Sequence, residues 1–383
     1  MRRIGHYAPN LWASGGIATY VRRLGDAQVA SGHDVVYFSA SPAHRGEEKT
    51  VIVDSEAALY AQAEALGLDV LHLHKPVADP DAAPVPLVRT MHGNQGSCPT
   101  GSRYLVRSGA PCTRMYSPAG CFVSHLTERC GSLRPDKLKR HFGGIKRELY
   151  AGTRMHTFTV SGYLRDRMVA TGFDPTRLHV LLSPAPDVDA PYVPTPADGV
   201  ARFLFLGRLV DQKGAEWLLR AFARVRGPAH LDIGGDGPLQ GRLEAFCRAN
   251  GLSDRVTFHG WVKGGDVPAL IQRSRAVVFP SVWQEPAGLV TLESAAYGRA
   301  VIASEVGGIP EYARDDFALR VPPNDVDRLA AAIERLIERH DEAETRGRAG
   351  YALARAQFSM RTFIDRLDAL YDMALQAGEL RTV

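Results

Sequence analysis

Residues 202–214 read RFLFLGRLVDQKG: a short apolar strand, a loop bounded by Gly207 and Gly214, and then the start of a helix. The order of strand, loop and helix recurs as far as residue 303. Further strands are predicted at 229–233, 256–259, 276–279 and 300–303, and helices at 215–226, 238–250, 267–273 and 288–297. Buried strands that alternate with helices form a parallel sheet covered on both faces. We therefore predict a doubly wound α/β domain over residues 200–358.

The N-terminal half shows the same alternation less regularly. A helix is predicted at 17–30, and strands are predicted at 3–7, 34–38, 50–53, 69–74 and 86–91. Five prolines between Ser183 and Gly199 exclude regular structure there. The predicted organisation is a first Rossmann-like domain over 1–185, a linker over 186–199, the domain over 200–358, and a C-terminal helix over 359–383 that packs back toward the first domain.

Length and composition exclude several classes of protein. The chain has 383 residues, of which 45% are hydrophobic and 23% charged. It is too long for a small binding module and too balanced for a disordered or fibrous protein. No apolar run has the length of a signal peptide or a membrane span, so we expect a cytoplasmic protein without an integral anchor.

Candidate ligand-binding residues follow the predicted strands, at the edge where open α/β sheets bind ligands. Gly207, Arg208 and Lys213 follow the first strand of the second domain, and Gly235 follows the next strand. Two cations in a loop with glycines suit a diphosphate, because the backbone approaches closely and the charge is neutralised without a metal. Each loop alone would also fit an ordinary solvated turn.

The loop after the strand at 276–279 carries two carboxylates eight residues apart, Glu285 and Glu293. The helix that follows should begin near Gly288, leaving backbone N–H groups there, including those of Leu289 and Val290, free to bind a phosphate. Glu293 can then accept hydrogen bonds from the hydroxyls of a ribose, and Glu285 from those of a sugar. As a lone pair of glutamates, the two would more often be surface residues.

Taken together, these motifs resemble the retaining glycosyltransferases of family four, the group 1 glycosyl transferases. The segments that carry the resemblance are Gly207-Arg208-Leu209, Lys213-Gly214, Gly235 to Pro238, Glu285 to Glu293, Gly307-Gly308-Ile309-Pro310-Glu311, Pro9 to Gly16, and Met91-His92-Gly93. The resemblance covers essentially the whole chain. It implies the GT-B fold, in which two Rossmann-like domains face each other across a deep cleft.

The resemblance also implies an activity and assigns residue roles. A sugar would pass from a nucleotide sugar, with UDP favoured and GDP open, to an unidentified acceptor with retention of configuration, in the synthesis of a glycan, glycolipid or glycosylated metabolite. No catalytic metal or other cofactor is expected. The catalytic residues would be His92, Arg208, Lys213 and Glu285. The donor-binding residues would be Gly15, Gly16, Gly207, Gly235, Val262, Pro286, Gly288, Leu289, Val290 and Glu293.

Three other functions remain open at this stage. A nonhydrolysing nucleotide-sugar epimerase could share the fold, although the two spaced glutamates argue against it. A non-catalytic sugar-nucleotide-binding protein would differ only in lacking turnover. A NAD-dependent oxidoreductase would need Gly-x-Gly-x-x-Gly after the first strand, where this chain has Gly15-Gly16 only.

Four of the five cysteines, Cys98, Cys112, Cys121 and Cys130, fall within 33 residues. Four thiolates can hold a structural zinc ion and so order a segment with little apolar core. The spacing lacks the Cys-x2-Cys knuckle, however, so unlinked thiols remain an alternative. Disulfides fit less well with a reducing cytoplasm.

Residues 101–180 hold fourteen Lys or Arg against five Asp or Glu, whereas the whole chain has a net charge of only +4. Lys137, Lys139 and Arg140 lie in a stretch interrupted by apolar residues. The pattern is typical of a helix that rests on an anionic membrane surface, here the inner face, or that binds a phosphorylated acceptor. It also fits a solvated helix packed on its own domain. Nucleic acid is not expected, because no stacking aromatics are interleaved with the basic residues.

Overall fold

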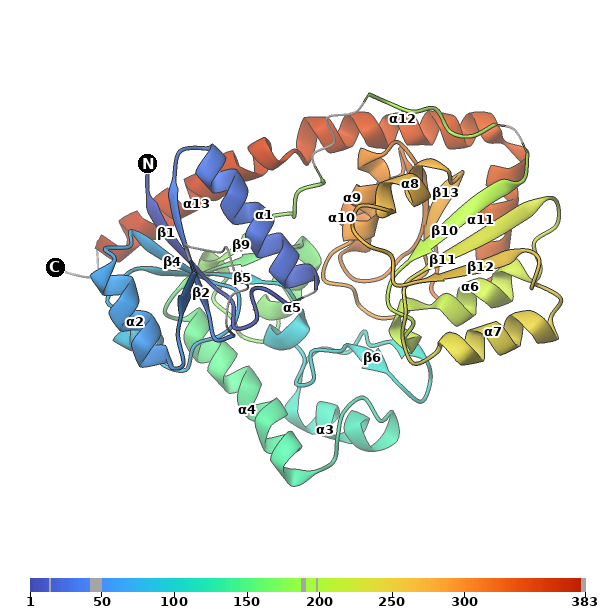
Figure 1. Ribbon diagram of the computed structural model, residues 1–383. Helices are drawn as coiled ribbons and strands as arrows, with labels where there is room; N and C mark the ends of the chain where they lie inside the picture. The colour runs from blue at the N-terminus through green and yellow to red at the C-terminus, as the bar shows by residue number, and fades with distance from the viewer. Residues whose placement is uncertain (14, 42–49, 187–190, 198, 380–383) are drawn as a thin grey trace.

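The computed structural model describes the chain except for residues 14, 42–49, 187–190, 198 and 380–383. Two parallel sheets, each covered by helices on both faces, lie side by side (Figure 1). The predicted fold class is therefore confirmed. Parts of the predicted linker and of the predicted C-terminal helix fall outside the described residues.

The first sheet has seven strands in the order β3-β2-β1-β4-β5-β8-β9, all parallel. Its strands are β1 (Arg3–Tyr7), β2 (Asp34–Ser39), β3 (Thr50–Ile52), β4 (Val70–Leu73), β5 (Leu87–Met91), β8 (His156–Thr159) and β9 (Leu178–Val180). Its helices are α1 (Gly16–Ala30), α2 (Glu56–Ala65), α4 (Pro135–Gly152) and α5 (Gly162–Val169), with single turns at Pro80–Ala82, Asn94–Gly96 and Pro175–Arg177. Strands β8 and β9 were not predicted, because both are short and carry polar residues.

The second sheet has six parallel strands in the order β12-β11-β10-β13-β14-β15. Its strands are β10 (Ala201–Leu206), β11 (Ala229–Gly234), β12 (Val256–Gly260), β13 (Ala276–Phe279), β14 (Ala300–Ser304) and β15 (Ala318–Val321). Its helices are α6 (Ala215–Phe222), α7 (Gln240–Ala249), α8 (Val267–Gln272), α9 (Leu289–Ala296), α10 (Ile309–Tyr312), α11 (Val326–Glu338) and α12 (His340–Gln357), with a single turn at Asp211–Lys213. Only β15 was missed among these strands.

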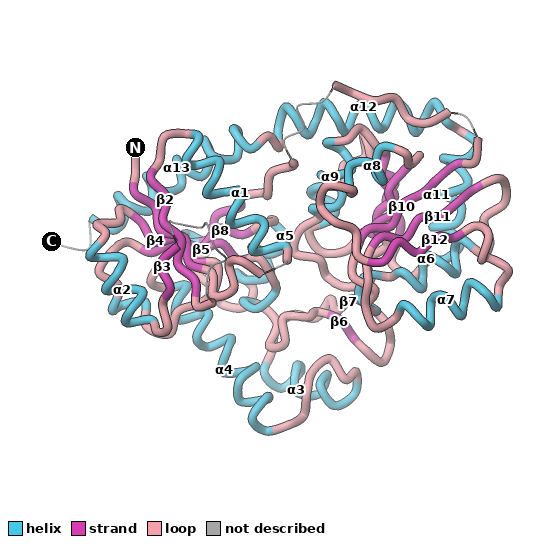
Figure 2. The backbone as a smooth tube through the Cα atoms, viewed as in Figure 1, coloured by secondary structure: helices cyan, strands magenta, loops and turns pink. Residues whose placement is uncertain are grey.

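Alternate residues of each strand enter separate cores on the two faces of the sheet. In β10, Phe203 and Phe205 pack with α6 and α11, whereas Leu204 packs on the opposite face with α8. The last helix, α13 (Met360–Glu379), follows α12 of the second domain and runs along the first domain (Figure 2). Its side chains Phe363 and Tyr371 are buried against the first sheet. The two domains are therefore joined by two connections, the linker and helix α13.

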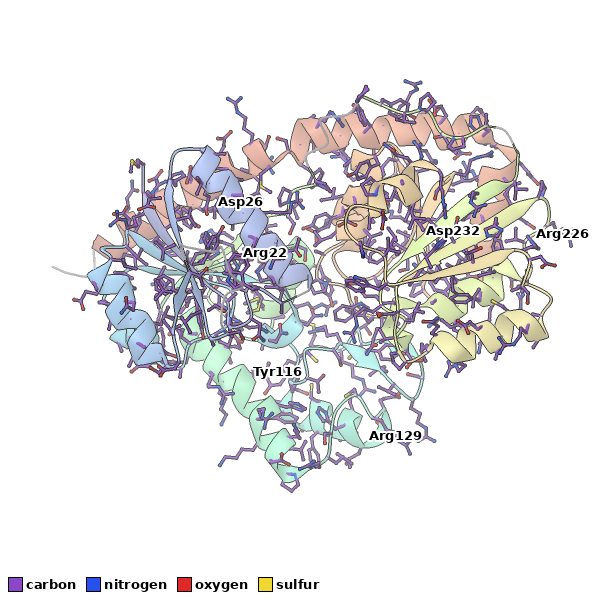
Figure 3. The ribbon with its side chains drawn as sticks, in the orientation of Figure 1. Arg22, Asp26, Tyr116, Arg129, Arg226 and Asp232 are labelled. Carbon is purple, nitrogen blue, oxygen red and sulfur yellow. The ribbon has the colours of Figure 1, made fainter. Side chains whose placement is uncertain are left out.

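A small lobe projects from the first domain between β5 and α4. We call residues 97–133 the cysteine lobe; it contains the hairpin β6 (Tyr104–Leu105) with β7 (Ala110–Pro111), and α3 (Pro118–Thr127). The hairpin reaches the second domain, where Tyr104 joins the core beside α6 and the Asn324 Nδ2 donates to the Gly109 carbonyl at 2.9 Å. Figure 3 shows Tyr116 and Arg129 on this lobe.

Direct hydrogen bonds also join the two domains at the strand ends. The Glu311 carboxylate of the second domain accepts from the N–H groups of Gly162 at 2.7 Å and Tyr163 at 2.8 Å, the first turn of α5. Ser161 Oγ, which caps the same helix, donates to the Pro286 carbonyl at 2.6 Å. A carboxylate suits this position, because the N-terminus of a helix has unpaired donors and a partial positive charge.

We expect Glu311→Ala to lower the free energy of unfolding by about 1–3 kcal/mol, since two charge-assisted hydrogen bonds are lost at a half-buried helix end. Urea denaturation measures the change. The matched control is Glu305→Ala, which removes an exposed carboxylate 3.8 Å from Arg320 and should change stability little. Equal shifts for the two variants would contradict the capping role.

Candidate functional site

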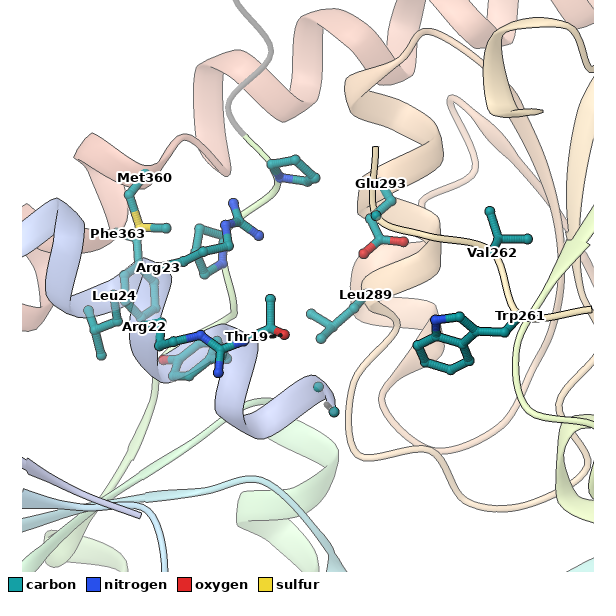
Figure 4. A pocket seen from close by; sticks show the side chains of 16 residues that line it. Thr19, Arg22, Arg23, Leu24, Trp261, Val262, Leu289, Glu293, Met360 and Phe363 are labelled. Carbon is teal, nitrogen blue, oxygen red and sulfur yellow. Dashed lines mark hydrogen bonds between the residues drawn. The ribbon is translucent and has the colours of Figure 1, made fainter. Parts of the chain in front are cut away.

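A cavity of about 460 Å³ lies between the two domains, where α1 faces the start of α9 and the loop after β12. Figure 4 shows Arg22 and Arg23 on the α1 side and Trp261, Val262, Leu289 and Glu293 on the opposite side. The residues that line it are Gly15, Gly16, Thr19, Tyr20, Arg22, Arg23, Leu24, Pro184, Pro186, Trp261, Val262, Gly264, Leu289, Glu293, Met360 and Phe363.

Glu293 projects into this cavity from the second turn of α9, with Arg23 on the opposite wall (Figure 4). Burial raises the pKa of the Glu293 carboxyl above its ordinary value, and the charge of Arg23 partly offsets that rise. The carboxylate has no hydrogen-bond partner among the described residues. A half-buried acceptor without a protein partner is suited to bind the hydroxyl groups of a ligand.

The start of α9 supplies donors next to this acceptor. Gly288 is the N-cap of the helix, and the N–H groups of Leu289 and Val290 have no acceptor among the described residues. Leu289 is partly exposed and lines the cavity. The arrangement can bind an anion through backbone groups and the helix dipole.

The two predicted cations after β10 lie in different environments. Arg208 is exposed, and its guanidinium has no partner in the part of the chain that the structure describes. Lys213 Nζ instead lies 2.6 Å from Glu285 Oε1, and it is 5.7 Å from the ring centroid of Phe279 and 5.5 Å from that of Trp283. Ser281 Oγ donates to the same carboxylate oxygen at 2.6 Å. Lys213 and Glu285 therefore form an ion pair, and their charges neutralise each other.

One predicted glycine, Gly235, is required by close packing, whereas two others, Gly15 and Gly16, lie in open space. Gly235 has φ of 134°, and a Cβ there would lie 1.9 Å from the Gly207 carbonyl oxygen. The loops after β10 and β11 therefore touch, and only glycine fits at position 235. By contrast, a Cβ on Gly15 or Gly16 would meet no atom within 4 Å, so these two glycines leave free space on the cavity wall.

His92 lies at the end of β5, beside the cavity rather than among its lining residues. Its Nε2 lies 3.0 Å from Nδ1 of His74, and its ring packs edge-on against Tyr20 at 4.9 Å. Burial and the nearby charges of Arg89 and Lys75 lower the pKa of His92 to about 3, so the ring is neutral at pH 7.

The predicted residues thus form two neighbouring groups. Gly15, Gly16, Val262, Leu289 and Glu293 line the cavity together. Lys213 and Glu285 are not among the residues that line the cavity. Glu285 belongs to the loop that leads to α9, and Lys213 pairs with it there.

The loop from 284 to 286 connects His92 to the second group. Asn94, two residues after His92, donates through Nδ2 to the Gln284 carbonyl at 2.8 Å. Pro286 acts through its carbonyl, which binds Ser161.

Several cavity residues were not predicted. Arg22 and Arg23 come from the middle of α1, and Met360 and Phe363 from α13. Trp261, the neighbour of the predicted donor-binding residue Val262, is 62% exposed at the cavity edge, which marks its indole as a stacking surface. The return of α13 to the cleft could not be predicted from the sequence, because it depends on the tertiary fold.

The cysteine lobe brings its four cysteines around one small cavity of about 30 Å³, which is also lined by His125. All five cysteines of the chain are unpaired. Burial, followed by the neighbouring Cys98, Cys112 and Cys121, raises the pKa of Cys130 to about 11.

The four sulfurs of the lobe are not close enough together in this structure to bind one metal ion. No three of them lie within 4.8 Å of one another; among the described residues, only His6, His72 and His74 form a group of that kind.

No helix in the described ranges is long and apolar enough to cross a membrane. An exposed apolar patch is present instead on the cysteine lobe. It consists of Phe122, Val123, Leu126 and Leu133, each between 45% and 53% exposed. The basic residues Arg129, Lys137, Lys139 and Arg140 lie on the same lobe and on the first turns of α4.

Two family models match the chain. Residues 14–183 match the model described as Glycosyltransferase Family 4, and residues 201–339 match the model described as Glycosyl transferases group 1. The matches cover both domains and the cleft between them.

Curated relatives are similar over shorter stretches. An uncharacterized glycosyltransferase of Methanocaldococcus jannaschii is 31% identical over 231 residues, 56% of this chain and 58% of the relative. The alpha-D-kanosaminyltransferase of Streptomyces kanamyceticus is 33% identical over 172 residues, 44% of each chain. The chain thus spans about half the length of these two relatives.

Solved structures share the fold over nearly the whole chain. Sucrose-phosphate synthase from Thermosynechococcus elongatus superposes with a TM-score of 0.73 at 21% identity, over 98% of this chain and all of the other. Anabaena HepE in complex with UDP-glucose has a TM-score of 0.70 at 16% identity, over 97% of this chain and all of the other.

Proposed function

The chain belongs to the glycosyltransferases of family four, and on that premise we propose that it transfers a sugar from a nucleotide-sugar donor to an acceptor with retention of configuration. The observation that carries the proposal is the wall of the cavity around Glu293. There, a carboxylate without a partner among the described residues stands one turn from the unpaired N–H groups of α9. A ribose and a diphosphate need these two kinds of group side by side.

The nucleotide would bind against the second domain. Glu293 accepts hydrogen bonds from the two ribose hydroxyls, and the start of α9 binds the diphosphate. The base would lie against Trp261 and Val262, where an exposed indole offers a face for stacking. A UDP sugar is the favoured donor, in line with the UDP-glucose bound by the structurally similar HepE, and a GDP sugar is the alternative.

The charge that develops on the departing diphosphate would be stabilised by the cations Arg208 and Lys213. Arg208 is unpaired among the described residues, whereas Lys213 must leave Glu285 to reach a phosphate. This exchange would occur when the donor binds, and it frees the Glu285 carboxylate to accept from hydroxyls of the transferred sugar. Both cations would then be in place before the chemical step and would stabilise its transition state, so no catalytic metal is required.

Retention requires either a carboxylate nucleophile or attack on the face that the leaving group vacates. The candidate nucleophile Glu285 is already held by Lys213 and Ser281. We therefore favour direct attack by the acceptor hydroxyl, as the family resemblance implies. The sugar–phosphate bond breaks as the new glycosidic bond forms, and the proton of the hydroxyl passes to the departing diphosphate.

Glu293→Ala should weaken binding of the free nucleoside diphosphate by about 1–3 kcal/mol, because hydrogen bonds to a charged acceptor are lost. Glu285→Ala should lower turnover more than it weakens that binding, since it removes a contact to the sugar and leaves Lys213 free for the diphosphate. Calorimetry with UDP and GDP, together with steady-state kinetics, separates the two effects. Equal losses of nucleotide affinity in both variants would refute the assigned roles.

The four cysteines of the lobe would bind one structural zinc ion. They already line a common cavity, and rotation of their side chains would have to bring the sulfurs within reach of one ion. The lobe has little apolar core of its own, and its hairpin contacts the second domain through Tyr104. Zinc would therefore stabilise a contact between the domains as well as the lobe.

The purified protein should contain about one zinc per chain, since four cysteine ligands complete the tetrahedral coordination of a single ion. Cys121→Ser should lose the zinc and lower the melting temperature, whereas Cys247→Ser, a buried thiol in the second domain, should retain it. Elemental analysis and thermal denaturation measure both. A zinc-free protein whose lobe thiols react freely while it is folded would rule out the site and leave the transferase proposal intact.

The cysteine lobe and the start of α4 would rest on an anionic membrane surface. The exposed apolar residues Phe122, Val123 and Leu126 belong to α3, and α3 packs through His125 against His141 and Phe142 of α4, the helix that carries Lys139 and Arg140. Apolar side chains beside basic ones insert at a membrane interface and attract anionic headgroups. The lobe belongs to the first domain, which forms one wall of the cleft. A membrane bound to the lobe would therefore present the acceptor to that cleft.

Sedimentation with vesicles should show more binding to anionic than to neutral lipid, with the difference falling as salt rises. Replacing Lys137, Lys139 and Arg140 by Glu should abolish the difference. The control replaces Arg226, Arg248 and Arg328 of the second domain by Glu, an equal change of charge that should preserve binding (Figure 3 marks Arg226). Binding that ignores lipid charge would instead indicate an acceptor free in solution.

A further inference from the structure

Four histidines are gathered inside the first domain, and three of them, His6, His72 and His74, have no assigned role in the donor site. His6 on β1 and His72 on β4 are fully buried, and His74 is 3% exposed. His92 packs against Tyr20, which lines the cavity. The four histidines come from three neighbouring strands of the sheet, so their rings meet at its carboxyl edge. Such a cluster is costly to bury unless each ring nitrogen is hydrogen-bonded.

Hydrogen bonds join three of these rings in one chain. His92 Nε2 lies 3.0 Å from His74 Nδ1, and His74 Nε2 lies 3.0 Å from His6 Nδ1. The ring planes differ by only 28° and 26°, with centroids 5.2 Å and 5.3 Å apart. These separations fit rings that meet edge to edge through their nitrogens.

The chain ends on the side chain of Gln28, which is fully buried in α1. His6 Nε2 lies 2.6 Å from Gln28 Oε1, and Gln28 Nε2 donates to the Tyr371 hydroxyl at 3.2 Å. That hydroxyl lies 2.7 Å from His72 Nδ1, and the other nitrogen of His72 lies 2.7 Å from Thr90 Oγ1. The C-terminal helix therefore anchors the far end of the network.

Because the rings are neutral, each has one N–H and one lone pair. Burial lowers the pKa of His6 to about 4 and places that of His74 well below its ordinary value. Every link between two rings needs one proton, so the tautomer of one ring determines the tautomer of the next. The amide of Gln28 sets the direction, since its carbonyl oxygen faces His6.

We propose that Gln28, acting through His6 and His74, holds His92 in the tautomer that carries its proton on Nε2 and leaves Nδ1 as a hydrogen-bond acceptor. His6 donates from Nε2 to Gln28, His74 donates from Nε2 to His6, and His92 donates from Nε2 to His74. Nδ1 of His92 has no partner among the described residues, and its ring is partly exposed. It therefore accepts a hydrogen bond from a ligand rather than donating one.

The consequence for catalysis rests on the proposed function. In a sugar transferase, His92 would accept from a hydroxyl of the donor sugar and orient it, whereas the other tautomer would present an N–H at the same place. Gln28, His6 and His74 are then positioning residues that touch no substrate. Rotation of the Gln28 amide by half a turn would reverse the direction of every hydrogen bond in the chain. The orientation of this one buried amide therefore decides whether Nδ1 of His92 accepts or donates a hydrogen bond.

The first experiment needs no activity. The full chain is labelled with ¹⁵N-histidine, His6, His74 and His92 are assigned by replacing each with Gln, and the ring nitrogens are observed without nucleotide. We expect all three rings to carry the proton on Nε2 and not to titrate between pH 5 and 8. A proton on Nδ1 of His92, a mixture of tautomers, or displacement of the signals of His6 and His74 by added zinc would overturn the proposal.

The second experiment tests the coupling. Gln28→Met should produce a second tautomer at His92 and lower kcat by about two- to ten-fold, the upper value corresponding to one lost hydrogen bond, with nucleotide affinity unchanged. Tyr37→Phe is the control, because Tyr37 packs near His6 but forms no link in the chain. In a His92→Ala background, Gln28→Met should have no further effect on kcat.

An equal loss of kcat in that background would show that Gln28 acts only on stability and would overturn the relay. The two proposals fail separately. Absence of sugar transfer with every donor would refute the function and leave the tautomer result standing, whereas a reversed tautomer in an active enzyme would refute the relay alone.

Discussion

The loop from 284 to 286 is the feature on which the rest of the cleft depends, because its backbone is hydrogen-bonded to both domains. The Gln284 carbonyl accepts from Asn94, and the Pro286 carbonyl accepts from Ser161. Within the second domain, the Glu285 carbonyl accepts from Gly308 N at 2.7 Å. A Cβ on Gly307, where φ is 57°, would lie 2.1 Å from that oxygen, so only glycine allows the contact. The same few residues thus set the start of α9, the place of Glu285 and the distance to the strand end at His92.

Some charged side chains around the cleft form an ion pair, and others have no partner among the described residues. Lys213 and Glu285 form a pair, whereas Arg208 and Glu293 have no partner among the described residues. An unpaired carboxylate in a half-buried position costs stability, and the raised pKa of Glu293 reflects that cost. Binding sites commonly retain such groups, because a ligand supplies the missing partner. The ion pair between Lys213 and Glu285 keeps both side chains oriented in the loop that leads to α9.

The first domain contributes the charges of Arg22 and Arg23 to the cavity, and it also contributes contacts that fix the geometry of the cleft. Its buried histidine chain connects the cleft edge to α1 and α13, and its cysteine lobe carries the hairpin that packs against α6 of the second domain. Glu311 binds α5 from the other side. The relative placement of the two sheets therefore rests on several small polar and apolar contacts distributed around the cleft. This arrangement suits a molecule in which two walls must face one ligand, since each contact positions a different part of the wall.

The sequence alone determined the fold class, the strands β10 to β14 of the second domain and the loops at their carboxyl ends. Such features are local: the alternation of apolar residues, a glycine at a turn or a proline in a linker acts on near neighbours in the chain. The short strands β8, β9 and β15 lacked that signal and were missed.

Only the tertiary structure decided which distant side chains meet. Lys213 and Glu285 are 72 positions apart and Gln28 and Tyr371 are 343 apart, so no periodicity along the chain reports their contact. Hydrogen bonds act over about 3 Å, whatever the separation of the two residues in the sequence. Contacts between distant residues therefore decide whether a charged or polar side chain is free or already paired.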